Sequence, residues 1–209
     1  MSKVILIRHA ESIKNLKKIH GGQGEELTDL GIEQAQSVAK FLKDNRIDLN
    51  LKIYASTSFH TRATAQIIAE KLNLPIEKPY EFAPLYLGIA DGLSEQQLED
   101  ISPETSELFR LWRNKEIDIK KLVVKDMESY QDFWNRGKTL LSTLPTDKDV
   151  MMVCSNSLMI LLTHIMAGND PNLTDNYKHF SIPNCGMVTF ERIGLDFKLS
   201  NSFTNVNIY

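Results

Sequence analysis

The sequence is poor in cysteine, carries no excess of basic residues and has no long apolar run. Its two cysteines, Cys154 and Cys185, lack the spacing of metal ligands, and one pair in a chain of this length makes no disulfide framework. We therefore expect both thiols to be reduced and partly buried. The formal net charge of −3 argues against nucleic-acid and membrane partners. No apolar run approaches the ~18 residues needed to cross a bilayer, so we expect a cytoplasmic protein.

The rest of the composition is that of an ordinary globular protein. Hydrophobic residues make up 42% of the 209 residues, which is enough for one large core. No segment has the composition of a linker between domains. We therefore expect a single domain over residues 1–209.

An apolar strand followed by a polar loop and a helix occurs three times along the chain. Strands are predicted at residues 4–7, 51–55 and 150–153, and helices from Thr28 to about Asn45, through residues 67–72, and over residues 158–166. This order is typical of a parallel sheet with crossover helices. A capping-box pattern at Ser94 opens a mostly helical insertion over residues 94–145, and a hairpin that includes residues 197–199 is expected to close the domain. The sequence predicts an α/β fold, a three-layer sandwich with a mainly parallel central sheet.

The pair Arg8-His9 directly follows the first predicted strand. Ligands of open α/β sheets bind beyond the carboxyl ends of the strands, where such a pair can face an anion. A charged loop after a core strand would show the same two residues, so the pair alone does not decide between a site and a loop.

The residues around this pair form two longer motifs. The first reads Arg8-His9-Ala10-Glu11 with Asn15 four residues after Glu11, and the second reads Leu27-Thr28-x-x-Gly31-x-x-Gln34-Ala35, with Gly21-Gly22 between them. Together they resemble the histidine phosphatase superfamily, also called the phosphoglycerate mutase-like family, although Ala10 stands where the family has glycine. The resemblance implies a phosphoglycerate mutase-like fold whose helical insertion lies over the active site.

The resemblance also implies roles for residues near the motif. His9 is expected to be the nucleophile, through a phosphohistidine intermediate, and Arg8 to hold the phosphoryl oxygens. Asn15 would add a neutral donor, and Glu11 would orient Arg8 or the loop. No metal or other cofactor is implied, because protein groups already supply the cations that a metal would replace.

Three further departures from the family pattern bear on activity. His60 aligns with a family arginine, and Arg62, two residues later, could replace it only if the loop folds differently. Pro84 aligns with the glutamate commonly taken as the general acid. Asp91 is then the best remaining carboxylate, unless it is only a turn residue before Gly92; Glu81 and Glu95 are poorer candidates.

The third departure is Ser155, which aligns with the family's second histidine. A hydroxyl donates one hydrogen bond and carries no charge, so this replacement should weaken stabilisation of the transferring phosphoryl group by ~3 kcal/mol. Ser155 is therefore a catalytic position at which the chain is expected to be impaired.

The remaining histidines have different expectations. His20 and Gly21 lie on a polar, glycine-containing stretch, residues 12–26, which is expected to cover the substrate; His20 contacts the phosphate only if this loop folds back over His9. His164, on an apolar helix, is expected to be a core residue, and His179 a surface loop residue.

These observations leave three interpretations open. The first is a phosphatase acting on a small phosphomonoester or a phosphorylated protein, weakened or inactivated at Ser155. The second is a phosphoglycerate mutase-type phosphotransferase, and the third is a non-catalytic protein that binds a phosphorylated ligand. The sequence does not predict the oligomeric state.

Overall fold

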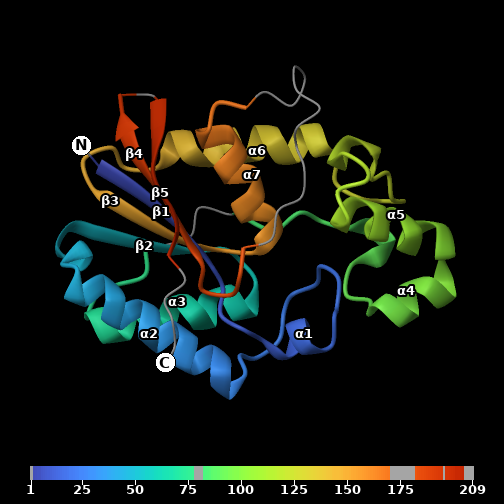
Figure 1. Ribbon diagram of the computed structural model, residues 1–209, viewed down its shortest axis with the longest axis horizontal. Helices are drawn as coiled ribbons and strands as arrows, with labels where there is room; N and C mark the ends of the chain where they lie inside the picture. The colour runs from blue at the N-terminus through green and yellow to red at the C-terminus, as the bar shows by residue number, and fades with distance from the viewer. Residues whose placement is uncertain (1, 78–81, 170–181, 195, 205–209) are drawn as a thin grey trace.

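The computed structural model describes residues 2–77, 82–169, 182–194 and 196–204. Within these residues the centre of the molecule is one five-stranded sheet with the strand order β2-β3-β1-β4-β5 (Figure 1). The strands are β1 (Ser2–Arg8), β2 (Leu51–Ala55), β3 (Asp149–Cys154), β4 (Met187–Ile193) and β5 (Asp196–Thr204). All three strands predicted from the sequence are present.

The sheet combines parallel and antiparallel pairs. β3 lies parallel to both β1 and β2, so that Arg8 is level with Cys154, and Ala55 with Val153. β4 pairs antiparallel with β1, and β5 antiparallel with β4, as the predicted closing hairpin. The predicted α/β fold is confirmed, with a parallel part that carries the motifs and an antiparallel edge. The loops after β1, β2 and β3 therefore leave the sheet at the same end.

Helices cover both faces of this sheet (Figure 1). Side chains alternate along β1, so Ile5 and Ile7 pack with α2 (Asp29–Asp44) and α3 (Phe59–Leu72). Val4 and Leu6 pack on the other face with α6 (Tyr130–Thr143) and α7 (Asn156–Met166). Each such buried side chain contributes about 1.5–3 kcal/mol of transfer free energy. The three-layer arrangement predicted from the sequence is confirmed.

Side-chain caps determine where several helices begin. Thr28 Oγ1 accepts a hydrogen bond from Gly31 N at 3.0 Å, and Ser94 forms the predicted capping box with Gln97. Ser155 Oγ accepts from Leu158 N at 3.4 Å. Because Ser155 is this cap, α7 begins at Asn156, two residues earlier than predicted.

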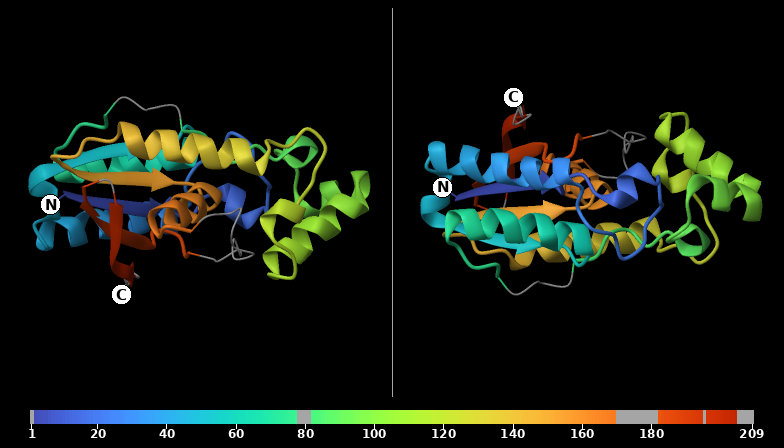
Figure 2. Two further views of the ribbon diagram at one scale, coloured as in Figure 1. Left: turned by 90° about the horizontal axis from the view of Figure 1, so that it is seen from above. Right: turned by 90° about the horizontal axis from the view of Figure 1, so that it is seen from below.

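Short elements lie beyond the carboxyl ends of the parallel strands (Figure 2). They are α1 (Ile13–Leu16), α4 (Glu95–Ile101), α5 (Pro103–Arg113) and the 3-10 turns η2 (Gly88–Ala90) and η3 (Ile119–Lys121). The 3-10 turn η1 (Ile47–Asn50) instead directly precedes β2, at the amino ends of the parallel strands. Residues 94–145 are mostly helical as predicted, but α6 packs on α7 as part of the core. Only α4 and α5 therefore project past the end of the sheet.

Both cysteines are free thiols. They are more deeply buried than the sequence suggested, with exposed fractions of 0% for Cys154 and 5% for Cys185. Burial raises the pKa of Cys185 to about 12, so this thiol stays protonated and unreactive at neutral pH. In the described part of the chain, no helix has the length and apolar character to cross a membrane.

Candidate active site

A cavity of about 270 Å³ lies at the carboxyl ends of β1 and β3. Its walls come from segments far apart in the sequence: Arg8, His9, Lys14, Asn15, Ile19, His20, Gly21, Ser58, His60, Pro84, Leu85, Leu87, Phe109, Trp112, Arg113, Ser155, Asn156 and Ser157. A larger groove of about 540 Å³ lies between α6, α7 and the β4–β5 hairpin, and it contains none of the motif residues. The chemistry therefore points to the smaller cavity.

The imidazole of His9 is held in the tautomer that a nucleophile needs. Its Nδ1 lies 2.8 Å from the carbonyl oxygen of Ala10, and because a carbonyl only accepts, Nδ1 carries the proton and Nε2 keeps its lone pair. Burial, followed by the nearby His60 and Arg8, lowers the pKa of His9 well below its ordinary value. Asn184 Nδ2 donates to the His9 carbonyl at 2.9 Å and fixes the backbone. His9 is therefore neutral and oriented.

Arg8 presents an unused donor at this site. Its Nη1 donates to the carbonyl of Ile182, whereas its Nε is buried and has no partner among the described residues. Burial lowers the pKa of Arg8, but a guanidinium remains charged at neutral pH. An unpaired buried N–H costs about 1–3 kcal/mol, so this donor fits an anion that binds beside His9.

Asn15 is fixed by the turn that carries it. Its Oδ1 accepts hydrogen bonds from Ser12 N and Oγ, both at 3.1 Å, and from Asn184 Nδ2 at 3.3 Å. The carboxamide oxygen is thus fully committed to the protein. The Nδ2 donors are left for the cavity, as expected for a neutral phosphate contact.

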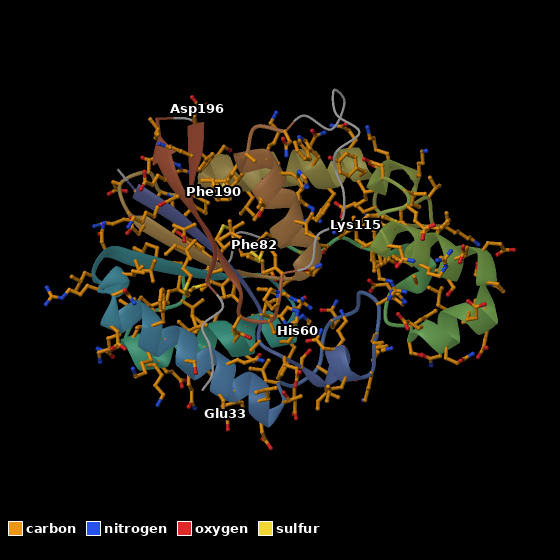
Figure 3. The ribbon with its side chains drawn as sticks, in the orientation of Figure 1. Glu33, His60, Phe82, Lys115, Phe190 and Asp196 are labelled. Carbon is orange, nitrogen blue, oxygen red and sulfur yellow. The ribbon has the colours of Figure 1, made fainter. Side chains whose placement is uncertain are left out.

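His60 lies directly beside His9. Their ring centroids are 4.0 Å apart, and Nδ1 of His60 is buried with no hydrogen-bond partner in the described part of the chain. Burial, then Lys14 and Arg8, lowers the pKa of His60 to about 3, so its ring is neutral. Figure 3 shows His60 where α3 begins, at the end of the sheet.

Arg62 lies outside the cavity. It is exposed on α3 and does not line the site. Two residues of an α-helix turn by about 200°, so positions 60 and 62 point to nearly opposite sides. Of the two candidates for the second cation, the structure therefore places only His60 beside His9.

The loop of residues 12–26 folds over the cavity as expected. His20 N donates to Leu93 O at 2.8 Å, and Gly92 N donates to His20 O at 2.7 Å. The His20 ring lies 4.8 Å from that of Phe109, and burial, then Arg113, lowers the pKa of His20 to about 4. Gly21 has a φ of +45°, and a Cβ at this position would lie 1.9 Å from Asp91 Oδ1. The positive φ therefore favours glycine here, and the missing side chain gives the Asp91 carboxylate room beside the loop.

Among the described residues, no carboxylate lines the cavity. Asp91, directly after η2, packs its carboxylate against Gly21 and does not line the cavity, although it is near enough to oppose the lowering of the pKa of Lys14 by burial. Glu11 accepts from Thr28 Oγ1 at 2.8 Å and so joins its loop to the start of α2, away from Arg8. Glu95 contacts Arg113 and lies 4.0 Å from Lys18; Glu81 is outside the described residues. In the described part of the chain, the site therefore combines a neutral imidazole with cationic side chains and has no carboxylate in its lining.

Of the remaining predicted positions, some line the cavity and others lie elsewhere. Ser155 and Pro84 line the cavity, and Ser155 Oγ lies 3.2 Å from Ser157 Oγ. His164 lies elsewhere on α7, with its Nδ1 2.8 Å from Asn169 Nδ2. His179 is outside the described residues.

Two charged residues of the cavity were missed by the sequence analysis. Lys14 lies within the first motif, where a single lysine does not indicate a role. Arg113 lies on α5, four residues after Phe109 and one residue after Trp112. The three α5 residues share one helix face, a pattern that could have linked Arg113 to its neighbours. What could not be read was that this face meets β1.

A second cavity of about 310 Å³ adjoins the first. It is lined by Lys14, Asn15, Lys18, Ile19, His20, Glu95 and Arg113, five of which also line the first cavity. Within the described residues, no group of three His, Cys, Asp or Glu side chains is arranged to hold a metal ion. The two cavities together form a small, mainly cationic site that fits a phosphorylated molecule.

Comparison with known proteins identifies the class to which this fold and site belong. The model of the histidine phosphatase superfamily (branch 1) matches residues 4–202. The chain belongs to this superfamily, which includes phosphatases and mutases.

Individual relatives differ in activity. The chain is 31% identical over 142 residues to phosphoserine phosphatase 1 of Hydrogenobacter thermophilus, covering 68% of this chain and 63% of the relative. It is 26% identical over 156 residues to a fructose-2,6-bisphosphatase of Saccharomyces cerevisiae, covering 74% of this chain and 32% of the relative. It is 33% identical over 118 residues to a 2,3-bisphosphoglycerate-dependent phosphoglycerate mutase of Buchnera aphidicola, covering 54% of this chain and 49% of the relative. The match thus spans about a third to a half of these last two proteins.

Solved structures share the fold over nearly the whole chain. Bacillus stearothermophilus YhfR superposes with a TM-score of 0.83 at 19% identity, covering 99% of this chain and 100% of that one. A phosphoserine phosphatase of Entamoeba histolytica gives a TM-score of 0.72 at 25% identity, covering 99% and 98%. The phosphoglycerate mutase-like fold is therefore established.

Proposed function

We propose that this protein is a phosphomonoester hydrolase that works through a phosphohistidine at His9. The observation that carries the proposal is the neutral imidazole of His9, fixed by Ala10, beside the unpaired Nε of Arg8. Nε2 of His9 attacks phosphorus, an N–P bond forms, and the P–O bond to the leaving group breaks. Water then attacks the phosphohistidine, releases inorganic phosphate and restores His9.

The neighbouring side chains fit this reaction as oxygen ligands. Arg8 offers a charged donor and Asn15 offers its Nδ2 to the non-bridging oxygens. His60, as a neutral ring, adds a hydrogen bond and not a charge. The proposed substrate is a small phosphomonoester, because the cavity measures only about 270 Å³ and relatives include a phosphoserine phosphatase.

The lack of a lining carboxylate determines which substrates should react. A leaving oxygen with a high pKa needs a proton as the P–O bond breaks, and among the described residues no carboxylate lines the cavity. We expect turnover of p-nitrophenyl phosphate, whose leaving group needs no acid, to exceed that of an alkyl phosphate by at least 100-fold, about the usual contribution of a general acid.

The test combines turnover with trapping of the intermediate. Wild-type protein incubated with a labelled phosphomonoester and then denatured in base should carry a base-stable, acid-labile phosphate on His9. His9→Ala should abolish both label and turnover, while His164→Gln, outside the cavity, should retain both. Undiminished turnover in His9→Ala would contradict the proposal.

A second candidate function is binding of a phosphorylated ligand without catalysis. Ser155 and Pro84 at two family catalytic positions, and the lack of a lining carboxylate, favour it. Phosphate-sensitive binding with no turnover and no label would support this alternative. A mutase-type phosphotransferase would instead pass the label to a phosphoglycerate acceptor faster than to water.

A further inference from the structure

The cavity contains fewer positive charges than its residue names suggest. Three histidines line it, but burial keeps all three neutral at physiological pH, with pKa values lowered to about 3 for His60, about 4 for His20, and well below the ordinary value for His9. The charged lining residues are therefore Arg8, Lys14 and Arg113. A phosphomonoester dianion bound at His9 needs more than one of them.

Arg113 is committed to another partner. Its Nη1 contacts the carboxylate of Glu95 at the side of the second cavity. Lys14, in contrast, forms no ion pair or hydrogen bond through its ammonium group in the part of the chain that the structure describes. Asp91 and Glu25 are near enough to oppose the lowering of its pKa by burial, but neither forms an ion pair with it, so the donors of its ammonium group remain available to a ligand.

The position of Lys14 is built into the motif turn. The capping box of Ser12 and Asn15 fixes the single turn of α1, so that Lys14 and Asn15 line the same cavity wall. Lys14 is half-buried, and among charged groups it is the largest influence that lowers the pKa of His60, while it also lowers that of His9. Its ammonium group therefore lies within electrostatic reach of both rings.

We propose that Lys14 binds the phosphoryl group of the substrate and supplies the second positive charge of the site, which the family takes from an arginine at the position of His60. The proposal rests on the proposed function, since it concerns the phosphate that His9 would attack. Position 60 holds a neutral imidazole, and Lys14 supplies the charge from α1, which follows β1 at the same end of the sheet. Burial of the ammonium group is unfavourable and lowers the pKa of Lys14. A bound phosphate would offset this cost by placing a negative charge beside the ammonium group.

Binding of orthovanadate, a mimic of the transferring phosphoryl group, tests this role without requiring turnover. We expect Lys14→Gln to weaken vanadate binding at least tenfold and Lys14→Arg to stay within about threefold of wild type. Lys17→Gln is the matched control, because Lys17 is exposed at the end of the same turn and pairs with Glu25 at 3.1 Å. It should stay within twofold.

A double-mutant comparison separates charge replacement from a general effect. If Lys14 replaces the missing arginine, then His60→Arg should restore the charge, and the loss caused by Lys14→Gln should shrink at least fivefold in that background. A Lys14→Gln loss below twofold, with a thermal midpoint like that of wild type, would overturn the proposal. So would an equal loss in both backgrounds.

The same measurements distinguish this proposal from the proposed catalytic function. Vanadate binding that depends on Lys14 but is accompanied by no phosphohistidine and no turnover supports the lysine's role and contradicts hydrolysis. Turnover through His9 that is indifferent to Lys14→Gln supports hydrolysis and contradicts the lysine's role.

Discussion

The two imidazoles at the centre of the cavity couple its chemistry to protein stability. His60 is 2% exposed, and its ring faces His9, with Lys14 and Arg8 as the nearby cations. Below a pH of about 6.5 the His60 ring of the unfolded chain binds a proton, because histidine has a pKa of about 6.5 there. The His60 ring of the folded protein stays neutral at the same pH. The folded state therefore favours the neutral ring.

Stability should fall in acid because of His60. Its stabilising contribution is fully present above about pH 6.5 and is lost as the pH falls toward its folded pKa of about 3. We expect the urea midpoint of wild type to drop between pH 7 and pH 4.5, and His60→Gln to show a smaller drop. Both proteins contain the same carboxylates, so the effect of these groups on the urea midpoint cancels in the comparison. Parallel pH profiles of the two proteins would contradict the expectation that the folded protein keeps His60 neutral.

Ser155 affects both stability and the proposed reaction. Because its Oγ caps α7, Ser155→His should cost about 1 kcal/mol of unfolding free energy. The new imidazole would face the cavity and should raise p-nitrophenyl phosphate turnover at least tenfold, if the family's two-histidine mechanism operates here. Ser155→Ala is the control: it should lose the same stability without gaining turnover. Equal turnover in the two variants would argue for the binding function.

At the scale of elements, the start of α2 holds the first motif in place. Glu11 N donates to Gln34 Oε1 at 2.9 Å, and Thr28 N donates to Glu11 O at 3.1 Å. Gly31 makes this approach possible, because a Cβ there would lie 2.0 Å from the Glu11 carbonyl oxygen. The backbone of the second motif at Gly31 thus packs closely against the backbone of the first motif at Glu11 and holds it in position.

Gly31→Ala should therefore destabilise the protein, although alanine is the better helix former. We expect a loss of about 1–3 kcal/mol, the usual cost of overpacking, and weaker vanadate binding as the loop after His9 shifts. Ser37→Ala, in the exposed middle of α2, is the control and should change stability by no more than about 0.5 kcal/mol. A stabilised Gly31→Ala protein would show that the contact is not close.

At the scale of the whole molecule, charge is distributed unevenly. The chain carries a net charge of −3, yet among the described residues the paired cavities are lined by Arg8, Lys14, Lys18 and Arg113 and by one carboxylate, Glu95. An anionic substrate is therefore attracted by local charge and not by the protein as a whole. A substrate with a second anionic group could place it in the second cavity.

This distribution predicts a preference between two nearly identical compounds. 3-Phosphoglycerate differs from glycerol 1-phosphate by a carboxylate in place of a hydroxymethyl group, and we expect it to compete with vanadate at least tenfold better in low salt. Raising the ionic strength to 0.5 M should reduce this preference. Arg113→Gln should also reduce it, whereas Arg110→Gln, on the exposed face of α5 beside Glu107, should not. Equal competition by the two compounds would contradict a cationic second cavity.

Local patterns in the sequence determined most elements and the framework of the site. Buried strands at residues 4–7, 51–55 and 150–153 could be predicted because apolar runs reflect burial on both faces of a sheet. Helix starts at Thr28 and Ser94 could be predicted because a cap acts within three residues. The motif also indicated that Arg8, His9 and Asn15 would share a cavity, while their chemical roles stay predictions.

Tertiary structure alone decided which charges meet at His9. The choice between His60 and Arg62 depended on where α3 begins and hence on the direction in which each side chain points. Arg113 reaches the site from α5, and Asp91 packs against Gly21 outside the cavity lining, through contacts between residues far apart in the chain. Such contacts leave no mark in the local pattern, because burial and charge neutralisation depend on the packed surroundings of a residue and not on its neighbours in sequence.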